Sequence, residues 1–215
     1  MEKKRIVCYG DSNTWGFIGG KRTRYDEDTR WTGRLQNMLG SGYAVVEAGL
    51  SGRTTIYDNP FNPPTNGYAH MAPILLSAAP VDLLILMLGT NDFQTNIASS
   101  ALDTARAVQF MLAEAKKLAA NRPGEEMKIL LIAPAAMDEI RLERKFPLDS
   151  IDAKGIQSSK ELGGYLKEVA QLNGYPFIDA NDYIRPGEAD GTHWDADGHA
   201  KMAEVIFNKV KEILG

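Results

Sequence analysis

The chain has 215 residues, of which 44% are apolar and 24% are charged, and its net charge is −4. This is the composition of a globular protein with enough apolar residues for a sizeable core. It shows neither the basic stripe of a nucleic-acid groove nor the ~20 consecutive apolar residues of a membrane span. The first apolar run is too short for a secretory signal, and the single cysteine, Cys8, excludes an intramolecular disulfide. We therefore expect a cytoplasmic protein that binds neither nucleic acid nor membranes.

Short apolar runs along the chain predict five strands. They cover residues 6–9, 43–47, 81–88, 128–133 and 176–178. The third run is almost entirely apolar, as expected for a strand that is covered on both faces. Five segments with helical spacing of apolar residues alternate with these strands: 32–39, 68–79, 101–120, 152–172 and 198–214.

This alternation predicts an α/β fold with a five-stranded parallel sheet and helices on both faces. A flavodoxin-like strand order, 2-1-3-4-5, is the expected topology. Pro- and Gly-rich pieces at residues 59–67 and 121–124 are too short to separate domains. We therefore expect residues 1–215 to form a single domain.

Reactive residue types follow four of the predicted strands. In sheets of this kind, ligands bind beyond the carboxyl ends of the strands. The first strand is followed by Ser12, the second by Gly52 and the third by Asn91, while Asp190 and His193 follow the fifth. Loops at one edge of one sheet thus offer a hydroxyl, a glycine amide, a carboxamide and an acid–imidazole pair.

A serine becomes a useful nucleophile only when a base takes its proton. Three histidines are candidates. His70 is expected to be a surface or capping residue, and His199 opens the last helix, where a proton is disfavoured. His193 follows Asp190 by three residues, so one turn can direct the carboxylate to Nδ1 and leave Nε2 for Ser12. The sequence therefore predicts Ser12, His193 and Asp190 as catalytic residues.

The negative oxygen that develops on an ester carbonyl needs fixed donors. Three are predicted: the Ser12 N–H, the Gly52 N–H and the side-chain amide of Asn91. Acyl transfer would then proceed through an acyl-Ser12 intermediate, which water, an alcohol or peroxide resolves. No cofactor and no metal are expected for this reaction.

These blocks resemble those of the SGNH (GDSL-like) hydrolases, which are named for Ser, Gly, Asn and His in four separate blocks. They occur in the family's order: Gly10-Asp11-Ser12, Ser51-Gly52, Gly89-Thr90-Asn91-Asp92 and Asp190-Gly191-Thr192-His193. The resemblance implies a three-layer α/β/α sandwich. It also implies Ser12, Asp190 and His193 as the triad and Ser12, Gly52 and Asn91 as the oxyanion hole.

The strings Gly10–Gly16, Arg30–Gly33 and Gly49–Thr55 resemble the arylesterase/acyltransferase subgroup. That resemblance implies small acyl esters as substrates, acyl transfer beside hydrolysis, and a homo-oligomer with a restricted site entrance. Two positions depart from the family: Asn13 replaces the Leu of the GDSL string, and Glu47 stands where many members carry Asn.

Other interpretations of the same residues stay open. The C-terminal region holds an acid and imidazole cluster that suits zinc or manganese in a metal-dependent hydrolase: Asp190, His193, Asp195 and His199. A non-catalytic small-molecule binding module is a second alternative, although the chain contains no phosphate-binding glycine motif.

Several residues beside the motifs have two interpretations each. Trp15 and Trp194 are candidates for the substrate pocket, with core packing as the alternative. Arg53 is a substrate or subunit contact, or else a surface residue. Asp11 and Asp92 are expected to brace loops rather than to catalyse.

Overall fold

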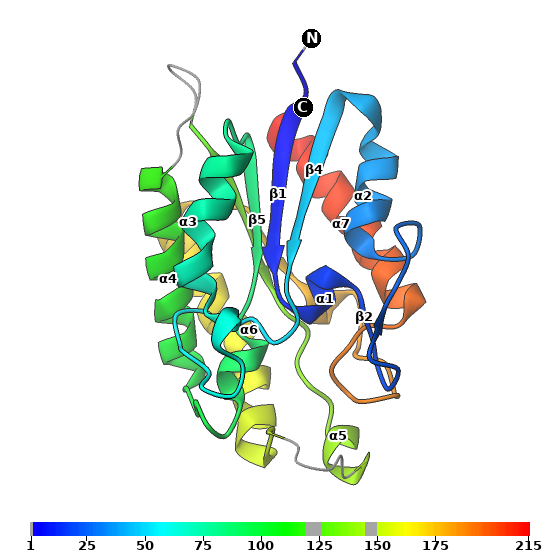
Figure 1. The fold of residues 1–215 in the computed structure, drawn as a ribbon, viewed down its shortest axis with the longest axis vertical. Coiled ribbons are helices and arrows are strands. Elements are labelled where there is room, and N and C mark those ends of the chain that lie inside the picture. Colours follow the sequence, from blue (N-terminus) through cyan, green and yellow to red (C-terminus); the bar gives the residue numbers. More distant parts are fainter. Residues whose placement is uncertain (1, 119–125, 145–149) are drawn as a thin grey trace.

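The computed structural model describes residues 2–118, 126–144 and 150–215. Its main sheet has five parallel strands in the order β4-β1-β5-β6-β7 (Figure 1). The strands are β1 (Lys4–Gly10), β4 (Tyr43–Gly49), β5 (Leu83–Met87), β6 (Lys128–Ala133) and β7 (Phe177–Asp179). In chain order this is 2-1-3-4-5, so both the parallel sheet and the predicted strand order are confirmed.

The alternation of side chains along the strands divides the core into two halves. In β1, Val7 and Tyr9 face one half, whereas Ile6 and Cys8 face the other. Every residue of β5 is buried, which confirms the expectation of a strand covered on both faces. The apolar runs are thus explained by burial on two sides rather than on one.

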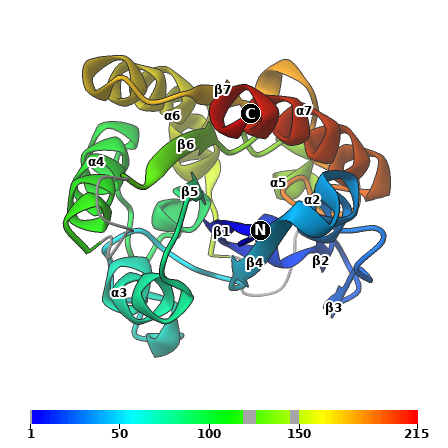
Figure 2. The ribbon, with the colours of Figure 1, turned by 90° about the horizontal axis from the view of Figure 1, so that it is seen from above.

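Helices cover both faces of the sheet (Figure 2). One face carries α3 (Gly67–Ala78), α4 (Ala101–Leu118) and α6 (Ala153–Asn173), and the other carries α2 (Trp31–Leu39) and α7 (Ala196–Leu214). This confirms the three-layer α/β/α sandwich. The last two residues of the predicted helix 101–120, and the piece 121–124, lie outside the described residues.

Short elements complete the described chain. They are α1 (Ser12–Trp15), α5 (Ile140–Arg144), a small antiparallel hairpin of β2 (Phe17–Ile18) and β3 (Thr23–Arg24), and four 3-10 helices. The 3-10 helices are η1 (Gly40–Gly42), η2 (Pro63–Thr65), η3 (Thr90–Phe93) and η4 (Ala180–Asp182). None of these elements was predicted, because two to five residues are too few to show a period.

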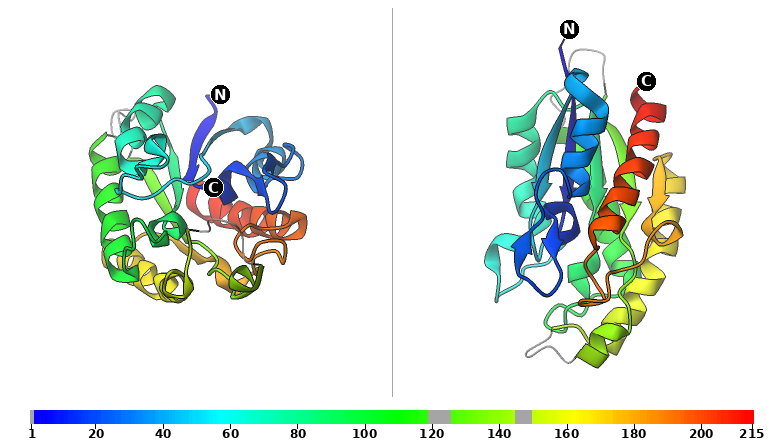
Figure 3. Two further views of the ribbon diagram at one scale, coloured as in Figure 1. Left: turned by 60° about the horizontal axis from the view of Figure 1, so that its bottom comes forward. Right: turned by 90° about the vertical axis from the view of Figure 1, so that its right-hand side faces the viewer.

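The carboxyl ends of the five strands meet at one edge of the sheet, with α1, β2 and α5 beside them (Figure 1). Both chain ends lie at the opposite edge (Figure 3). There the Lys4 Nζ donates to the Leu214 carbonyl, and the Tyr43 hydroxyl donates to the Gly215 carbonyl at 3.0 Å. Within the described ranges, no helix has the length and apolar character that crossing a bilayer requires.

Candidate active site

Ser12, His193 and Asp190 form one continuous chain of hydrogen bonds. The Ser12 Oγ lies 2.9 Å from His193 Nε2, and the other ring nitrogen, Nδ1, lies 2.7 Å from Asp190 Oδ2. An ionised carboxylate accepts but does not donate, so Nδ1 carries the ring proton and Nε2 accepts from the Ser12 hydroxyl. The structure therefore brings the three predicted residues into an arrangement in which an imidazole can take a proton from a serine.

Asp190 also folds the loop that carries His193. Its Oδ1 accepts the backbone N–H groups of Thr192 at 3.0 Å and of His193 at 2.9 Å. Burial alone would raise the pKa of Asp190, but the hydrogen bonds and charge of His193 and the two backbone donors hold that pKa below its usual value. The carboxylate thus stays ionised while it orients both the ring and the backbone of His193.

A tight turn at the end of β1 presents Ser12. Asp11 caps α1, and its Oδ1 accepts from the Asn13 N–H at 3.0 Å. Ser12 is the first residue of α1, so its own N–H has no acceptor within that helix. The turn also lies close to β4, where a Cβ on Gly49 would be 2.2 Å from the Trp15 backbone nitrogen. Only glycine at that position lets α1 approach the sheet so closely.

The other two predicted oxyanion donors lie on loops next to this turn. Gly52 follows β4 with a φ of +81°, in the left-handed region that favours glycine. Asn91 lies in η3, after β5, and its Nδ2 donates to the Arg53 carbonyl oxygen at 3.1 Å. That bond uses one of the two N–H groups of the amide. Because β4, β1 and β5 are neighbours, Ser12, Gly52 and Asn91 share one edge of the sheet.

The Arg53 side chain connects the ends of β1 and β4. Its Nη1 donates to the carbonyl oxygens of Gly10, at 2.9 Å, and of Ala48, and its guanidinium lies 4.1 Å from the centre of the Tyr9 ring. Arg53 is 3% exposed, so the interpretations as a surface residue and as a substrate or subunit contact are wrong. Burial lowers the pKa of Arg53 from its usual value, and the two backbone carbonyls at Nη1 replace part of the hydration that water would otherwise give.

The Asp92 carboxyl group holds the loop that follows β4. Its Oδ1 accepts from the Thr55 N–H at 2.8 Å, and its Oδ2 accepts from the Thr55 hydroxyl at 2.5 Å. Burial raises the pKa of Asp92 to about 7 in spite of these bonds, and it raises the pKa of Asp11 to about 6. Both carboxyl groups contact loop backbone, as expected for bracing residues.

The cluster considered for a metal is not assembled. His199 is fully buried and its Nδ1 accepts from the Trp31 N–H at 3.3 Å, while Asp195 caps α7 through the Gly198 N–H at 2.8 Å. Burial lowers the pKa of His199 to about 4. His70 is exposed on α3. Across residues 2–118, 126–144 and 150–215, no three His, Cys, Asp or Glu side chains are grouped to hold a metal ion.

Comparison with known proteins agrees with this geometry. A model of the GDSL-like lipase/acylhydrolase family matches residues 8–201. The chain belongs to this family. The resemblance seen in the sequence is thereby confirmed, and the chain is placed among the carboxylic ester hydrolases.

Solved structures of similar proteins include two full-length matches. The aryl esterase of M. smegmatis is 32% identical, with a TM-score of 0.89 over 98% of this chain and 100% of that chain. A carbohydrate acetylesterase from Sinorhizobium meliloti is also 32% identical, with a TM-score of 0.89 over 99% of this chain and 100% of that chain.

A relative by sequence is an acetylxylan esterase of Xylanibacter ruminicola, which is 29% identical over 96% of this chain. The match covers 43% of that relative, so the chain spans less than half of its length.

In this GDSL-like hydrolase the β2–β3 hairpin lies beside the hydrogen-bonded residues His193 and Asp190. The Phe17 ring packs on the His193 ring with the centroids 4.3 Å apart. A Cβ on Gly19 would lie 2.9 Å from Asp190 Oδ2. Neither residue could be predicted from the sequence, since neither belongs to a motif and two-residue strands carry no pattern. The only signal was their position directly after the Ser12 turn.

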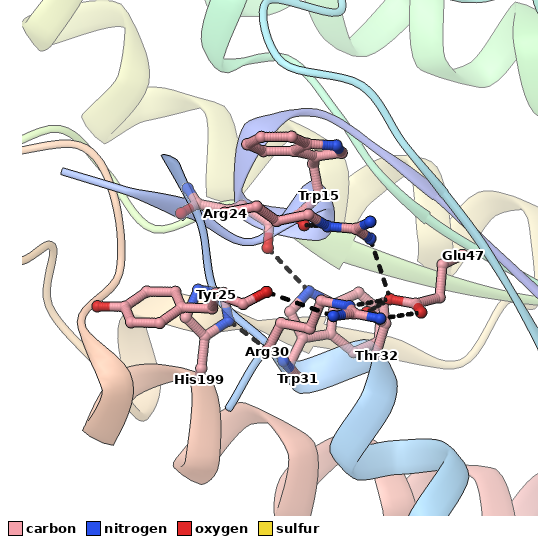
Figure 4. A network of polar contacts seen from close by, with 9 residues as sticks. Trp15, Arg24, Tyr25, Arg30, Trp31, Thr32, Glu47 and His199 are labelled. Carbon is pink, nitrogen blue, oxygen red and sulfur yellow. Dashed lines mark hydrogen bonds and ion pairs between the residues drawn. The ribbon is translucent and has the colours of Figure 1, made fainter. Parts of the chain in front are cut away.

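Glu47, which departs from the usual Asn of the family, anchors this hairpin (Figure 4). Its two carboxylate oxygens accept from Arg30 Nε at 2.5 Å and Nη2 at 2.6 Å, and it also accepts from the Thr32 hydroxyl and, at 3.3 Å, from Arg24 Nη2. Arg24 in turn donates to the Trp15 carbonyl at 2.6 Å. Burial would raise the pKa of Glu47, but its hydrogen bonds from Arg30 and Thr32 lower it below its usual value. An ionised Glu47 therefore ties β3 to β4.

The two candidate pocket tryptophans differ. Trp15 is half-buried at the edge of the site, 6.3 Å from the Phe17 ring and 5.4 Å from the Arg24 guanidinium. The prediction that Trp194 lines the pocket is wrong. Its side chain is 1% exposed and packs in the core beside the His199 ring, at 5.5 Å. Directly after His193 the chain has already turned inward, which sequence spacing does not reveal.

Asp138 and the first residues of α5 contact the loop that carries His193. The Asp138 N–H donates to the Gly191 carbonyl at 2.8 Å, and Arg141 Nη1 donates to the Thr192 hydroxyl at 2.8 Å. Gly191 has a φ of +66°, and a Cβ there would meet Ile140 at 2.8 Å. The loop that carries the predicted base is thus held by contacts on more than one side.

Proposed function

We propose that this chain is a serine esterase that hydrolyses small carboxylic esters through an acyl-Ser12 intermediate. The observation that carries the proposal is the unbroken hydrogen-bonded chain from Asp190 through His193 to Ser12, at 2.7 and 2.9 Å. A hydroxyl, an imidazole and a carboxylate in this order are the parts that nucleophilic catalysis by serine needs.

In the first step, His193 Nε2 takes the Ser12 hydroxyl proton as Oγ attacks the ester carbonyl carbon. The carbonyl oxygen becomes negative and is stabilised by the N–H groups of Ser12 and Gly52 and by the Asn91 amide. His193 then gives its proton to the departing alkoxide, and the alcohol leaves. Asp190 stabilises the imidazolium during this step without accepting its proton.

In the second step, an acceptor hydroxyl loses its proton to His193 Nε2 and attacks the acyl-Ser12 carbonyl. Collapse of the second tetrahedral species returns the proton to Ser12 Oγ. Water as acceptor gives hydrolysis, whereas an alcohol or peroxide gives acyl transfer. The half-buried Phe17 ring on His193 supports an entrance that restricts water, and acyl transfer is therefore part of the proposal.

For the substrate we propose short acyl esters, with acetate first, of aromatic alcohols or sugars. The support comes from relatives: one is an aryl esterase, one is a carbohydrate acetylesterase and one is an acetylxylan esterase. A series of 4-nitrophenyl esters of increasing acyl length measures this preference. A kcat/KM that rises with chain length would contradict it.

The direct test is Ser12→Ala. We expect hydrolysis of 4-nitrophenyl acetate to fall by at least about 10³-fold, because no nucleophile replaces Oγ. A fluorophosphonate should label the wild-type protein at Ser12 and leave the variant unlabelled. Ser77→Ala, at an exposed serine on α3, is the matched control and should keep full activity.

Three results would overturn the proposal. Near-wild-type turnover by Ser12→Ala would exclude the acyl-Ser12 route. Loss of wild-type activity on exhaustive chelation, with recovery on adding zinc, would favour the metal-dependent alternative. Neither turnover nor labelling in the wild-type protein would favour a binding module.

A further inference from the structure

The Asn13 side chain bridges the nucleophile turn and the loop of the predicted base. Its Nδ2 donates to the Thr192 carbonyl oxygen at 3.3 Å, and its Oδ1 accepts from the Trp194 N–H at 3.0 Å. Thr192 and Trp194 are the residues on either side of His193. One amide therefore grips the backbone before and after the imidazole-bearing residue.

This amide can face the loop in one orientation only. With the amide turned over, Nδ2 would face the Trp194 N–H and Oδ1 would face the Thr192 carbonyl, which sets like against like at both ends. Asn13 is 3% exposed, so water cannot readily replace either bond. The pair of contacts is thus specific to a carboxamide, since Asp lacks the donor and Leu lacks both groups.

The backbone of Asn13 is fixed as firmly as its side chain. Its N–H donates to Asp11 Oδ1 at 3.0 Å, and its carbonyl accepts from Trp31 Nε1 at 3.1 Å. Asn13 follows Ser12 directly in α1. The Asn13 amide therefore has little freedom to move relative to Ser12. Through its two bonds to the His193 loop, the amide fixes the position of that loop relative to Ser12.

We propose that Asn13 is a positioning residue that sets the distance between His193 Nε2 and Ser12 Oγ. This inference rests on the proposed function and concerns the one position of the GDSL string where the chain departs from Leu. The contacts of Asp138 and Arg141 hold the loop at Gly191 and at the Thr192 side chain, before His193. Asp190 and Gly187 hold the backbone of Thr192 and His193 from within the same loop, whereas Asn13 contacts the backbone on both sides of His193 from α1.

The test compares Asn13→Leu and Asn13→Asp with the wild-type protein. Leu restores the usual family residue and removes both bonds, whereas Asp keeps the shape and the acceptor for Trp194 but loses the donor. Poor alignment of base and nucleophile lowers the chemical step, so we expect kcat to fall by about 10- to 100-fold with KM within about two-fold. The rate of labelling by a fluorophosphonate should fall in parallel, since it needs the same activated hydroxyl.

Asn181→Leu is the matched control for lost stability. Asn181 also accepts one backbone N–H, from Ala136 at 2.8 Å, and donates once, to Asp179 Oδ1 at 2.8 Å. We expect this variant to lose thermal stability with kcat unchanged. The low-field proton resonance of the His193–Asp190 hydrogen bond should broaden in Asn13→Leu and persist in Asn181→Leu.

Unchanged kcat in both Asn13 variants would overturn the inference, and so would equal losses of kcat in Asn13→Leu and Asn181→Leu. Its failure is distinguishable from failure of the proposed function. If Ser12→Ala is inactive but both Asn13 variants are fully active, only the role of Asn13 is excluded. If Ser12→Ala is active, the serine mechanism itself is excluded.

Discussion

One N–H of the Asn91 amide is used within the fold, and the other is the oxyanion donor of the proposed mechanism. Its Nδ2 donates to the Arg53 carbonyl at 3.1 Å, and its Oδ1 accepts from Gln94 Nε2 at 3.3 Å. The two bonds fix the plane of the amide and hence the direction of its second N–H. A donor that is fixed before the substrate arrives needs no reorganisation as negative charge develops on the carbonyl oxygen.

Asn91→Ala is therefore expected to lower kcat by about 10²- to 10³-fold with a much smaller change in KM. Steady-state kinetics with an aryl acetate measure both constants. Asn96→Ala is a matched control, because Asn96 is an exposed asparagine whose Nδ2 donates to Asn59 Oδ1, at 3.1 Å. A loss of kcat in Asn96→Ala that equals the loss in Asn91→Ala would contradict a specific role for Asn91.

For single residues, the sequence predicts those whose chemistry requires other reactive residues nearby. It misses those whose role depends on how they pack in the fold. Ser12, Asp190 and His193 were predicted because a hydroxyl, an acid and an imidazole have few other reasons to recur at strand ends. Arg53 was misjudged and Trp194 was left between pocket and core, since a charge or an indole can face water or the core. Only the positions of Gly10, Ala48 and the α7 residues in space decide between these two environments.

The β2–β3 hairpin is the element that closes one side of the site. It contributes Phe17, which packs on His193, and Gly19, which lies against Asp190. The pairing of β2 with β3 is short, so contacts with the rest of the fold help to hold it, among them the ion pair of Arg24 with Glu47. A hairpin with so few backbone hydrogen bonds of its own has no sequence pattern from which it could be predicted. The long apolar strands and the amphipathic helices, in contrast, were predicted within a few residues.

Gly19→Ala tests whether the hairpin must lie this close to the triad. The new methyl group would be 2.9 Å from Asp190 Oδ2 and 3.3 Å from Ala189 Cβ, so either the hairpin or the carboxylate has to move. We expect kcat/KM to fall by about 10-fold or more, with the free energy of unfolding changed by less than about 1 kcal/mol. Kinetics and denaturant unfolding measure the two effects.

Gly164→Ala is the corresponding control. Gly164 is exposed within α6, and a Cβ there has no neighbour within 4 Å. Alanine should stabilise the protein by about 0.5–1 kcal/mol, since glycine loses more backbone entropy in a helix, and activity should not change. Equal activity in Gly19→Ala and Gly164→Ala would show that the hairpin tolerates displacement.

For the whole molecule, buried ionisable side chains hold the backbone behind the site, and burying such groups costs free energy. Asp11, Arg53 and Asp92 are buried ionisable groups behind the carboxyl edge of the sheet. Loops at this edge need fixed backbone directions, and buried polar side chains supply hydrogen bonds that apolar residues cannot. The layer architecture could be predicted from apolar patterning alone, but the burial of these charges could not.

Asp92→Asn tests this cost through the pH dependence of stability. The pKa of Asp92 is about 7 in the folded protein against an ordinary value of 3.8. Between these values the folded protein retains a proton that the unfolded chain has lost, so the free energy of unfolding falls as pH rises from about 4 to about 7. Asparagine does not titrate, so the stability of Asp92→Asn relative to wild type should rise over the same interval.

Urea unfolding at several pH values measures the difference. Asp182→Asn, at an exposed carboxyl in η4, is the control and should follow the wild-type curve. Parallel curves for Asp92→Asn and wild type from pH 4 to 7 would mean that Asp92 is ionised throughout this range, contrary to the expected effect of burial.

The placement of the two chain ends has a practical consequence. Both ends meet at the amino edge of the sheet, where Lys4 and Tyr43 contact the last two residues (Figure 3). The triad opens at the far edge, a full strand length away. A carrier bead, an affinity tag or a reporter protein joined at either end would leave the entrance facing the solution. Immobilisation through these ends should therefore retain catalytic turnover, whereas coupling through surface lysines would orient the molecule at random.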